Sequence, residues 1–459
     1  MKIGRVISLI ICLGSMSAWA GEFQAGAAQV QITPPIGVPM SGYYYERAAT
    51  GVHDELYAHA LVFAKEGHKI ALVTCDLIGM DAQLVSQARQ CIEKVTGIPG
   101  GHVMISCTHA HTGPTLPRDS IRKSETAAGL ILSQYIETLP GRIAQAVKQA
   151  NDNLVSARLS AAVGHEDSIS FNRRFFMTDH TVGWNPGKLN PKIIKPAGPI
   201  DPAVAVVYVE SDSGTPISTV VNFANHLDTV GGLEFSADYP YTLYTLLSRF
   251  RGADMVTLFA QGCSGNINHI NVASGERQKG HAEAERIGTV LTGEVLKTFT
   301  KLDPIHPTCV VVRREIIKLP LPEVTSDDVA KARQIADTYN TSEAAPFMAL
   351  VNAFKVISVY EREGRPLEAE VQVMALGQEL AWVGLPGEVF VEIGLAIKQA
   401  SPYRVTIVTE LANDSIGYIP DRKAYAEGNY EPVSARCAAG SGEMLVQASL
   451  RLLNELKGL

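Results

Sequence analysis

Short apolar runs rich in β-branched residues recur along the chain, and they alternate with segments whose apolar residues recur every three or four positions. This alternation predicts an α/β fold with a mixed, substantially parallel sheet flanked by helices. Open α/β sheets bind ligands beyond the carboxyl ends of their strands, so we expect the functional site there. The expected strands are 56–63, 69–74, 103–106, 203–209, 218–223, 255–259, 310–313, 379–385 and 403–408.

Capping residues set the limits of several expected helices. Asp81 can cap a helix that ends before Gly97, and Ser124 can cap one that runs towards Leu139. Pro346 is a natural stop for a helix over 326–345. The other expected helices are 241–251, 281–298, 389–399 and 443–457.

Two polar stretches rich in glycine and proline, 178–202 and 411–442, are expected to be long loops. Neither of them separates regions of different composition. We therefore expect a single domain over residues 21–459.

The first 20 residues have the features of a secretory signal peptide. Lys2 and Arg5 precede an apolar run over 6–13, and Ala18-Trp19-Ala20 supplies a cleavage pattern. That run is too short to cross a bilayer, and no later stretch has the roughly 18 apolar residues that a spanning helix needs. We expect export to the periplasm or the extracellular space. The net charge of −7 argues against a nucleic-acid partner, because no basic patch stands out to neutralise phosphates.

The cysteines beyond the signal peptide are widely spaced, and no Cys-x-x-Cys occurs, so neither a thiolate zinc site nor a redox pair is expected. Cys75, Cys107 and Cys263 each close an apolar run, where a buried free thiol is expected. The sequence does not decide which cysteines pair, if any pair at all. The six are Cys75, Cys91, Cys107, Cys263, Cys309 and Cys437.

Side chains with metal-binding chemistry follow four of the expected strands. The segments concerned are Thr108-His109-Ala110-His111-Thr112-Gly113-Pro114, Asn225-His226, Pro386-Gly387-Glu388, and a loop with Asn413, Asp414 and Tyr418. Two histidines and a carboxylate are a common catalytic zinc set that leaves a position open for water. Zinc lowers the pKa of that water to about 7.

The His-x-His segment places both imidazoles on one side of an extended chain, because side chains alternate along it. His109 and His111 would then supply two metal ligands, or one ligand and one group for the substrate. A structural interpretation stands beside this one: these imidazoles and that of His226 can be hydrogen-bonded core or loop histidines. Glu388 can equally be an acid that a helix dipole favours.

Taken together, these segments resemble the neutral (non-lysosomal) ceramidase family. The segment 108–114 is similar to the family's Thr-His-Thr-His-Ser-Gly-Pro signature, and the motifs follow one another in the family's order over most of the chain. The other matching segments are Ile32-Thr33-Pro34-Pro35, Met40-Ser41-Gly42-Tyr43, Gly51-Val52-His53-Asp54-Glu55-Leu56-Tyr57-Ala58, Asn172-Arg173, Asn225-His226, 261–268, Pro386-Gly387-Glu388 and 413–419.

The resemblance implies a zinc amidase that cleaves the N-acyl bond of ceramide into a fatty acid and sphingosine. One Zn²⁺ per chain is expected, and the implied ligands are His109, His226, Glu388 and Tyr418. Tyr425 and Tyr430 lie close to Tyr418 in the sequence, and a small shift of alignment would choose one of them instead.

The resemblance also implies roles in catalysis. His111 and Arg173 would face the reacting carbonyl, polarise it and stabilise the developing oxyanion. Zinc-bound water would attack that carbonyl, and Glu388 or a nearby imidazole would handle the proton.

Two departures from the family pattern bear on the substrate. Asn268 stands where the family has a serine with an assigned catalytic role, which excludes a serine nucleophile at that position. Ser264, the nearest hydroxyl, lies outside any Gly-x-Ser-x-Gly elbow and is expected to be a supporting group. The chain is also expected to lack the family's C-terminal β-sandwich domain.

The leading hypothesis is an exported zinc-dependent hydrolase of N-acyl bonds, with ceramide or a related lipid as substrate. A lipid substrate would bring transient contact with a membrane surface, without a transmembrane segment. The alternative is a zinc hydrolase of the same fold acting on a non-sphingolipid amide or ester. A third hypothesis is a non-catalytic exported zinc-binding protein.

Overall fold

The computed structural model describes residues 22–42, 47–116, 127–339, 341 and 343–458. The expected signal peptide, the expected cap Ser124 and Tyr43 of the family motif lie outside these residues. Export and the single-domain organisation stay predictions.

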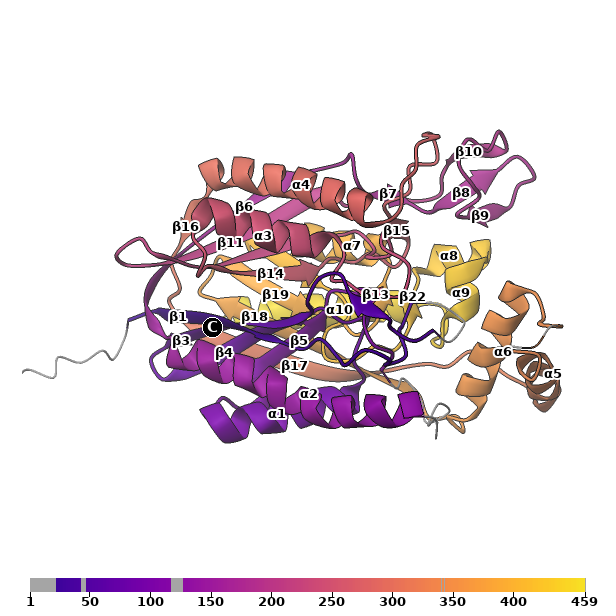
Figure 1. Cartoon of the computed structure of the whole chain (residues 1–459), viewed down its shortest axis with the longest axis horizontal. Helices are drawn as coiled ribbons and strands as arrows, with labels where there is room; N and C mark the ends of the chain where they lie inside the picture. The colour runs from indigo at the N-terminus through magenta and orange to yellow at the C-terminus, as the bar shows by residue number, and fades with distance from the viewer. Residues whose placement is uncertain (1–21, 43–46, 117–126, 340, 342, 459) are drawn as a thin grey trace, which may run out of the picture.

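The larger of the two main sheets is formed by nine strands of the described chain and is mixed (Figure 1). Most neighbours in it are antiparallel, and the parallel pairs lie at its two edges, β12 with β14 and β4 with β5. In spatial order the strands are β14 (Val256–Gln261), β12 (Pro216–Phe223), β11 (Ala203–Ser211), β6 (Val155–His165), β1 (Gln24–Gln31), β3 (Tyr57–Lys65), β4 (His68–Cys75) and β5 (Val103–Cys107), with β16 (Asp303–Ile305) beside β6.

The smaller sheet has the order β17 (Val310–Leu319), β18 (Leu367–Leu376), β19 (Leu380–Gly384) and β21 (Val405–Thr409). Its one long parallel ladder joins β19 to β21. Short ladders pair β2 (Gly51–Val52) with β13 (Glu234–Phe235), β7 (Phe171–Asn172) with β15 (Ile267–Asn268), β20 (Glu388–Val389) with β22 (Tyr418–Ile419), and β8 (Arg174–Met177) with both β9 (Val182–Trp184) and β10 (Ile193–Pro196).

Helices cover the outer faces of both sheets. In Figure 1, α1 and α2 lie along one part of the larger sheet, and α3 and α4 along another. The helices are α1 (Ala82–Thr96), α2 (Ala127–Asp152), α3 (Tyr239–Arg251), α4 (His281–Thr298), α5 (Ser326–Ala336), α6 (Phe347–Tyr360), α7 (Val391–Ala400), α8 (Arg422–Glu427), α9 (Tyr430–Ser434) and α10 (Ser441–Lys457).

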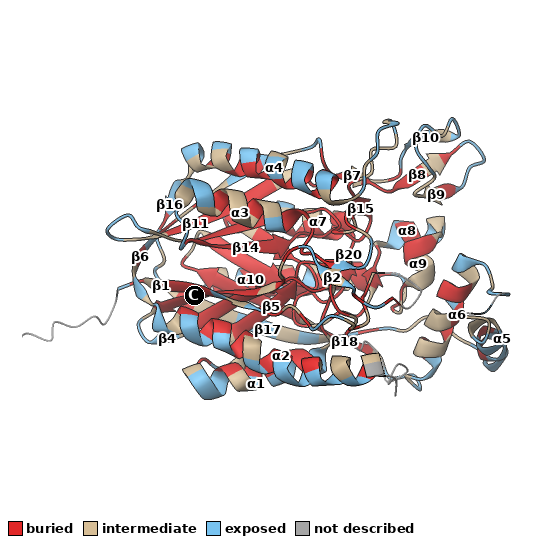
Figure 2. Ribbon diagram, in the orientation of Figure 1, coloured by how far each residue is buried: buried red, intermediate tan, exposed pale blue. Residues whose placement is uncertain are grey.

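The buried clusters show that these elements form four layers, helix–sheet–sheet–helix. Along β3, Val62 packs towards α1 and α2, whereas Leu61 and Phe63 pack against Trp382 of the smaller sheet. This is the period of two that places successive strand side chains on opposite faces. The outer face of the smaller sheet packs on α7 and α10. Figure 2 accordingly shows buried strands in the centre and exposed residues on the outer sides of the helices.

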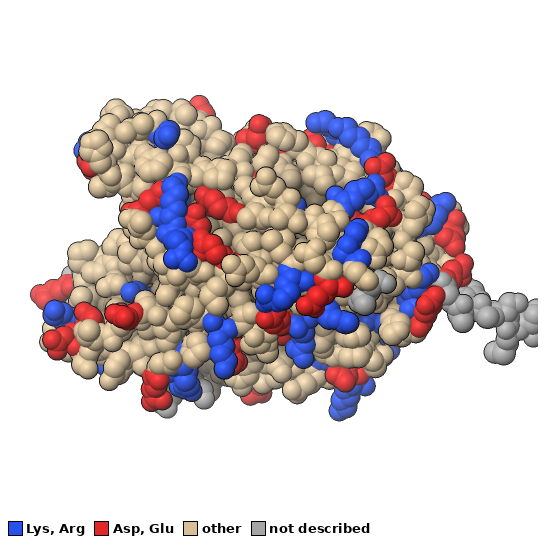
Figure 3. All heavy atoms as spheres, turned by 180° about the vertical axis from the view of Figure 1, so that it is seen from behind, with Lys and Arg blue, Asp and Glu red and all other residues tan. Residues whose placement is uncertain are grey.

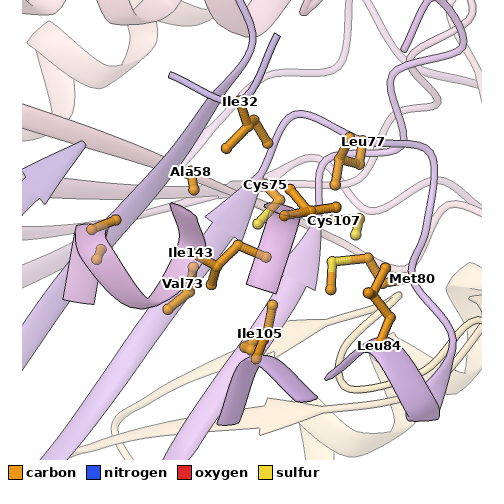
Figure 4. Packing of buried hydrophobic residues seen from close by; sticks show 14 of the residues in the cluster. Ile32, Ala58, Val73, Cys75, Leu77, Met80, Leu84, Ile105, Cys107 and Ile143 are labelled. Carbon is orange, nitrogen blue, oxygen red and sulfur yellow. The ribbon is translucent and has the colours of Figure 1, made fainter. Parts of the chain in front are cut away.

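The core under α1 and α2 contains two of the cysteines expected to be buried thiols. Cys75 and Cys107 are register partners on β4 and β5, and both lie among the aliphatic side chains of Figure 4. All six cysteines in the described residues are thiols, and Cys75, Cys107 and Cys263 are buried, as expected.

The predicted fold class is confirmed, with corrections in detail. The parallel content is limited to the ladders named above, so the sheets are less parallel than expected. The helix expected over 326–345 ends as α5 at Ala336, and Pro346 instead precedes α6, because proline is well tolerated where a helix begins. The two expected loops contain β9 and β10, and β22, α8 and α9, respectively.

Acidic and basic side chains are interspersed on the face of the molecule seen from behind in Figure 3. Among the described residues, every helix is too short or too polar to cross a membrane.

Candidate metal centre

The side chains expected to bind metal come together where strands of both sheets end. His109 and His111 follow β5, His226 follows β12, Glu388 begins β20 after β19, and Tyr418 begins β22. The strands β5, β12 and β19 deliver their carboxyl ends to the same region, as expected for a ligand site in an α/β fold.

The His-x-His segment converges through a turn and not through an extended chain, which corrects the geometry expected above. His109 has a φ of 75°, a left-handed conformation that is uncommon for a residue with a side chain and that is often found at functional sites. Gly42 packs against this turn with a φ of 90°, and a Cβ there would lie 2.5 Å from the carbonyl oxygen of His111. Arg47 Nη2 donates to the same carbonyl at 2.8 Å.

The three imidazoles meet through their Nε2 atoms. His109 Nε2 lies 3.0 Å from His226 Nε2 and 3.3 Å from His111 Nε2. The rings of His109 and His226 are nearly perpendicular, at 89°. His109 and His226 are buried, and His111 is partly exposed, which makes it the member of the group nearest to solvent.

Backbone carbonyls fix the tautomers of the two buried imidazoles. His109 Nδ1 lies 2.8 Å from the carbonyl oxygen of Ile78, and His226 Nδ1 lies 3.1 Å from that of Ser264. A carbonyl only accepts, so both Nδ1 atoms carry hydrogen, and a neutral ring then has a lone pair on Nε2. Two lone pairs facing each other at 3.0 Å repel, and a cation between them removes that repulsion. Histidine ligands in metal sites are held in this way.

A carboxylate completes the donor set. Glu388 Oε2 lies 3.4 Å from His109 Nε2 and 3.8 Å from His226 Nε2. Its neighbour Gly265 cannot carry a side chain, because a Cβ would lie 2.6 Å from the Glu388 carbonyl oxygen.

The register of β20 and β22 places Tyr418 directly beside Glu388. Among the alternatives, Tyr425 donates its hydroxyl to the carbonyl of Cys437 at 2.7 Å, and Tyr430 packs its ring against that of Tyr418. Tyr418 is thus the tyrosine whose backbone is hydrogen-bonded to that of the carboxylate segment.

Arg173 contacts Tyr418 and not the imidazoles. Its Nη2 donates to the Tyr418 hydroxyl at 3.0 Å and to the Gly265 carbonyl at 2.6 Å, and its Nε donates to Glu431 at 2.8 Å. Glu431 is fully buried and also accepts from Arg174 Nη1 at 3.0 Å. No sequence pattern pointed to Glu431, because its partners lie more than 250 residues away.

Burial and neighbouring charges shift the pKa values in the site. Burial, with a contribution from His109, lowers the pKa of His111 to about 3. Burial also lowers the pKa of His226 well below its ordinary value, and Arg173 adds to this. Burial raises the pKa of Tyr418 well above its ordinary value although the Arg173 charge opposes it. His111 and His226 are therefore neutral at neutral pH, the form that binds metal.

The side chains of Asn268 and Ser264 are both engaged in hydrogen bonds. Asn268 Nδ2 donates to Asn185 at 3.0 Å. Ser264 Oγ accepts from Gln261 at 2.7 Å and donates to Glu410 at 2.6 Å. Glu410 is fully buried, burial raises its pKa to about 8, and sequence reasoning missed it.

A largely buried group of three histidines and a carboxylate near the strand ends of an α/β fold defines a candidate metal-binding protein. Residues 23–226 match the family described as neutral/alkaline non-lysosomal ceramidase, N-terminal. This match confirms the resemblance that the motifs predicted, over that part of the chain.

Two solved structures share the fold. Neutral ceramidase from Pseudomonas aeruginosa superposes with a TM-score of 0.73 at 17% identity, over 95% of this chain and 75% of that one. A ceramidase complexed with C2 gives a TM-score of 0.72 at 17% identity, over 95% and 76% of the two chains. No curated protein sequence matches the chain.

Proposed function

We propose that this chain is an exported zinc-dependent amidohydrolase that cleaves the N-acyl bond of ceramide or of a related N-acyl lipid. The observation that carries the proposal is the convergence of His109 Nε2 and His226 Nε2 at 3.0 Å with both Nδ1 hydrogens committed to carbonyls. The family match over residues 23–226 supports the amide as the bond that is cleaved.

The donor set fits zinc. Imidazole nitrogens with one carboxylate oxygen suit this ion, whereas calcium and magnesium prefer oxygen ligands. His109, His226, Glu388 and Tyr418 would hold it. Bound zinc supplies a Lewis acid and lowers the pKa of water, so that a nucleophile is available at neutral pH.

The side chains around the donors have distinct tasks in this proposal. His111, neutral and on the solvent side, is available to hydrogen-bond the substrate carbonyl. Glu388 offers a carboxylate oxygen within 3.8 Å of both buried imidazoles and can take up a proton during attack. Arg173 holds the Tyr418 hydroxyl, so we assign it a positioning role through that phenol in addition to charge stabilisation.

The proposal of a ceramide-like substrate rests on the family match, and Asn268 supports a second candidate substrate. Asn268 stands at the family's serine position and is engaged with Asn185, so the surroundings of the reacting bond differ from the family pattern there. The alternative is the hydrolysis of a non-sphingolipid amide or ester by the same zinc chemistry. An N-acyl lipid would be reached by transient contact with a membrane surface.

A substrate panel tests the proposal. The purified protein is assayed for fatty-acid release from a fluorescent N-acyl-sphingosine, from a matched N-acyl amino acid and from an acyl ester, with and without a zinc chelator. We expect turnover of the N-acyl-sphingosine that stops with chelator and returns with added zinc. Chelator-sensitive turnover of another substrate alone would support the alternative. Bound zinc with no turnover of any substrate would contradict hydrolase function.

A further inference from the structure

A second group of metal-binding side chains lies outside the buried centre. His53 follows β2, Asp54 is the next residue, and His281 is the first residue of α4. One ligand atom from each of the three lies within 4.8 Å of the others. His53 is exposed and His281 is partly exposed, so an ion can reach them directly from solvent.

The two imidazoles are stacked face to face. Their ring centroids are 3.5 Å apart and their planes differ by 11°. The stack brings a ring nitrogen of His53 within 4.8 Å of a ring nitrogen of His281.

Asp54 fixes one of these imidazoles. Its Oδ2 lies 2.9 Å from His53 Nδ1, and the carboxylate also accepts from Ser236 Oγ at 2.6 Å and from the backbone N–H of Ala237 at 2.7 Å. When the carboxylate accepts a hydrogen bond from Nδ1–H, the lone pair of the His53 ring lies on Nε2, where it can bind a metal ion. The same carboxylate–histidine arrangement orients the ligands of known metal sites.

We propose that His53 and His281, oriented and charge-balanced by Asp54, form a second site that binds a divalent transition metal ion such as Zn²⁺, Ni²⁺ or Cu²⁺. Imidazole donors select these ions over Ca²⁺ and Mg²⁺. Water would fill the remaining positions, because the His53 side chain is 44% exposed.

The ion would join two parts of the fold that are distant in sequence. It would tie the first turn of α4 to the segment after β2, where the His53 N–H already donates to the Phe235 carbonyl at 2.9 Å. Ser236, which holds Asp54, accepts at its carbonyl from Thr112 Oγ1 at 2.9 Å, and Thr112 follows His111. Occupancy would therefore brace the segment next to the buried centre without touching it.

The test compares metal content in three full-length proteins: wild type, His53→Gln/His281→Asn, and the control His68→Gln/His180→Asn, which alters two other histidines. Each is equilibrated with Zn²⁺, dialysed and measured by mass spectrometry of the metal. We expect His53→Gln/His281→Asn to hold one equivalent of zinc less than wild type, and the control to hold the same amount as wild type. The test measures a difference in zinc content between two proteins that share the same buried centre. Its outcome therefore does not depend on whether that centre binds zinc.

Thermal unfolding is the second measurement, and it tests the site even if the ion is lost on dialysis or the double variant folds poorly. Zn²⁺ or Ni²⁺ should raise the thermal midpoint of wild type more than that of the single variants His53→Gln and His281→Asn. Ca²⁺ or Mg²⁺ should not produce this difference. N-acyl hydrolysis by the variants should stay within about twofold of wild type. Equal metal content in all three proteins, with equal thermal shifts in wild type and single variants, would overturn the proposal.

Discussion

His109 Nε2 and His226 Nε2 lie 3.0 Å apart, although each imidazole donates its Nδ1–H to a backbone carbonyl. The two residues follow β5 and β12, which lie far apart in the order of the larger sheet. Buried polar groups are normally paired with a complementary partner, so two facing lone pairs point to a cation that belongs between them.

Tyr418→Phe tests the choice of tyrosine. The Tyr418 hydroxyl accepts from Arg173 and its backbone pairs with Glu388, so its loss should weaken zinc binding or kcat about 10- to 100-fold. Tyr425→Phe is the matched control and should stay within about threefold of wild type. Metal affinity and hydrolysis rates measured in parallel would contradict the assignment if the control lost as much as Tyr418→Phe.

Ser264→Ala tests the absence of a serine nucleophile. The hydroxyl is engaged with Gln261 and Glu410, and His226 is held by the Ser264 backbone carbonyl, which the substitution keeps. We expect kcat to fall no more than about tenfold, whereas removing a nucleophilic serine costs on the order of a million-fold. A loss of that larger size in steady-state assays would rule out the supporting role.

Glu431→Gln tests the buried charge network behind Tyr418. Glu431 accepts from both Arg173 and Arg174, and removing one partner of a buried ion pair costs about 3 kcal/mol or more. The free energy of unfolding from urea titration should fall by that amount. Glu210→Gln breaks a surface pair with Arg158 and should cost about 0–1 kcal/mol. Equal losses in the two variants would contradict the account.

Local signals in the sequence predicted much of the fold. Asp81 and Gly97 bound α1 as expected, because the Asp81 side chain accepts from the N–H of Leu84 and Gly97 adopts a φ of 72°. Both interactions are made within a few residues, so the sequence contains them completely.

The sequence did not predict strands whose conformation depends on distant partners. The strand β18 is rich in the helix formers leucine, glutamate and alanine, and β6 is rich in alanine and serine. Their conformation is set by pairing with β17 and β11, which no local pattern reports. The convergence of His109 and His111 was expected for the wrong reason, since a left-handed residue makes the turn.

Asp414→Asn tests a pH dependence outside the metal centre. Burial raises the pKa of Asp414 to about 6 from 3.8, so this group makes wild-type stability fall as pH rises from about 4 to about 6. Its Oδ1 accepts from Ala82 and Ser415, and an asparagine oxygen can do the same. The variant should therefore gain about 1–2 kcal/mol relative to wild type across that range.

Urea titrations at pH 4, 5, 6 and 7 measure this difference, with Asp254→Asn as an exposed control. The gain should grow up to about pH 6.5 and then level off, and the control should show no such trend. A gain that shrank as pH rose would mean that the Asp414 pKa is lowered in the folded state.

The most direct test of the metal centre is zinc content and N-acyl hydrolysis measured together in His109→Ala, His226→Ala and the surface control His68→Ala. Each centre variant should lose one equivalent of zinc relative to wild type and at least about 100-fold in kcat/KM, because an interaction made in the transition state is removed. The control should match wild type in both. Full zinc content and full activity in His109→Ala and His226→Ala would contradict the account.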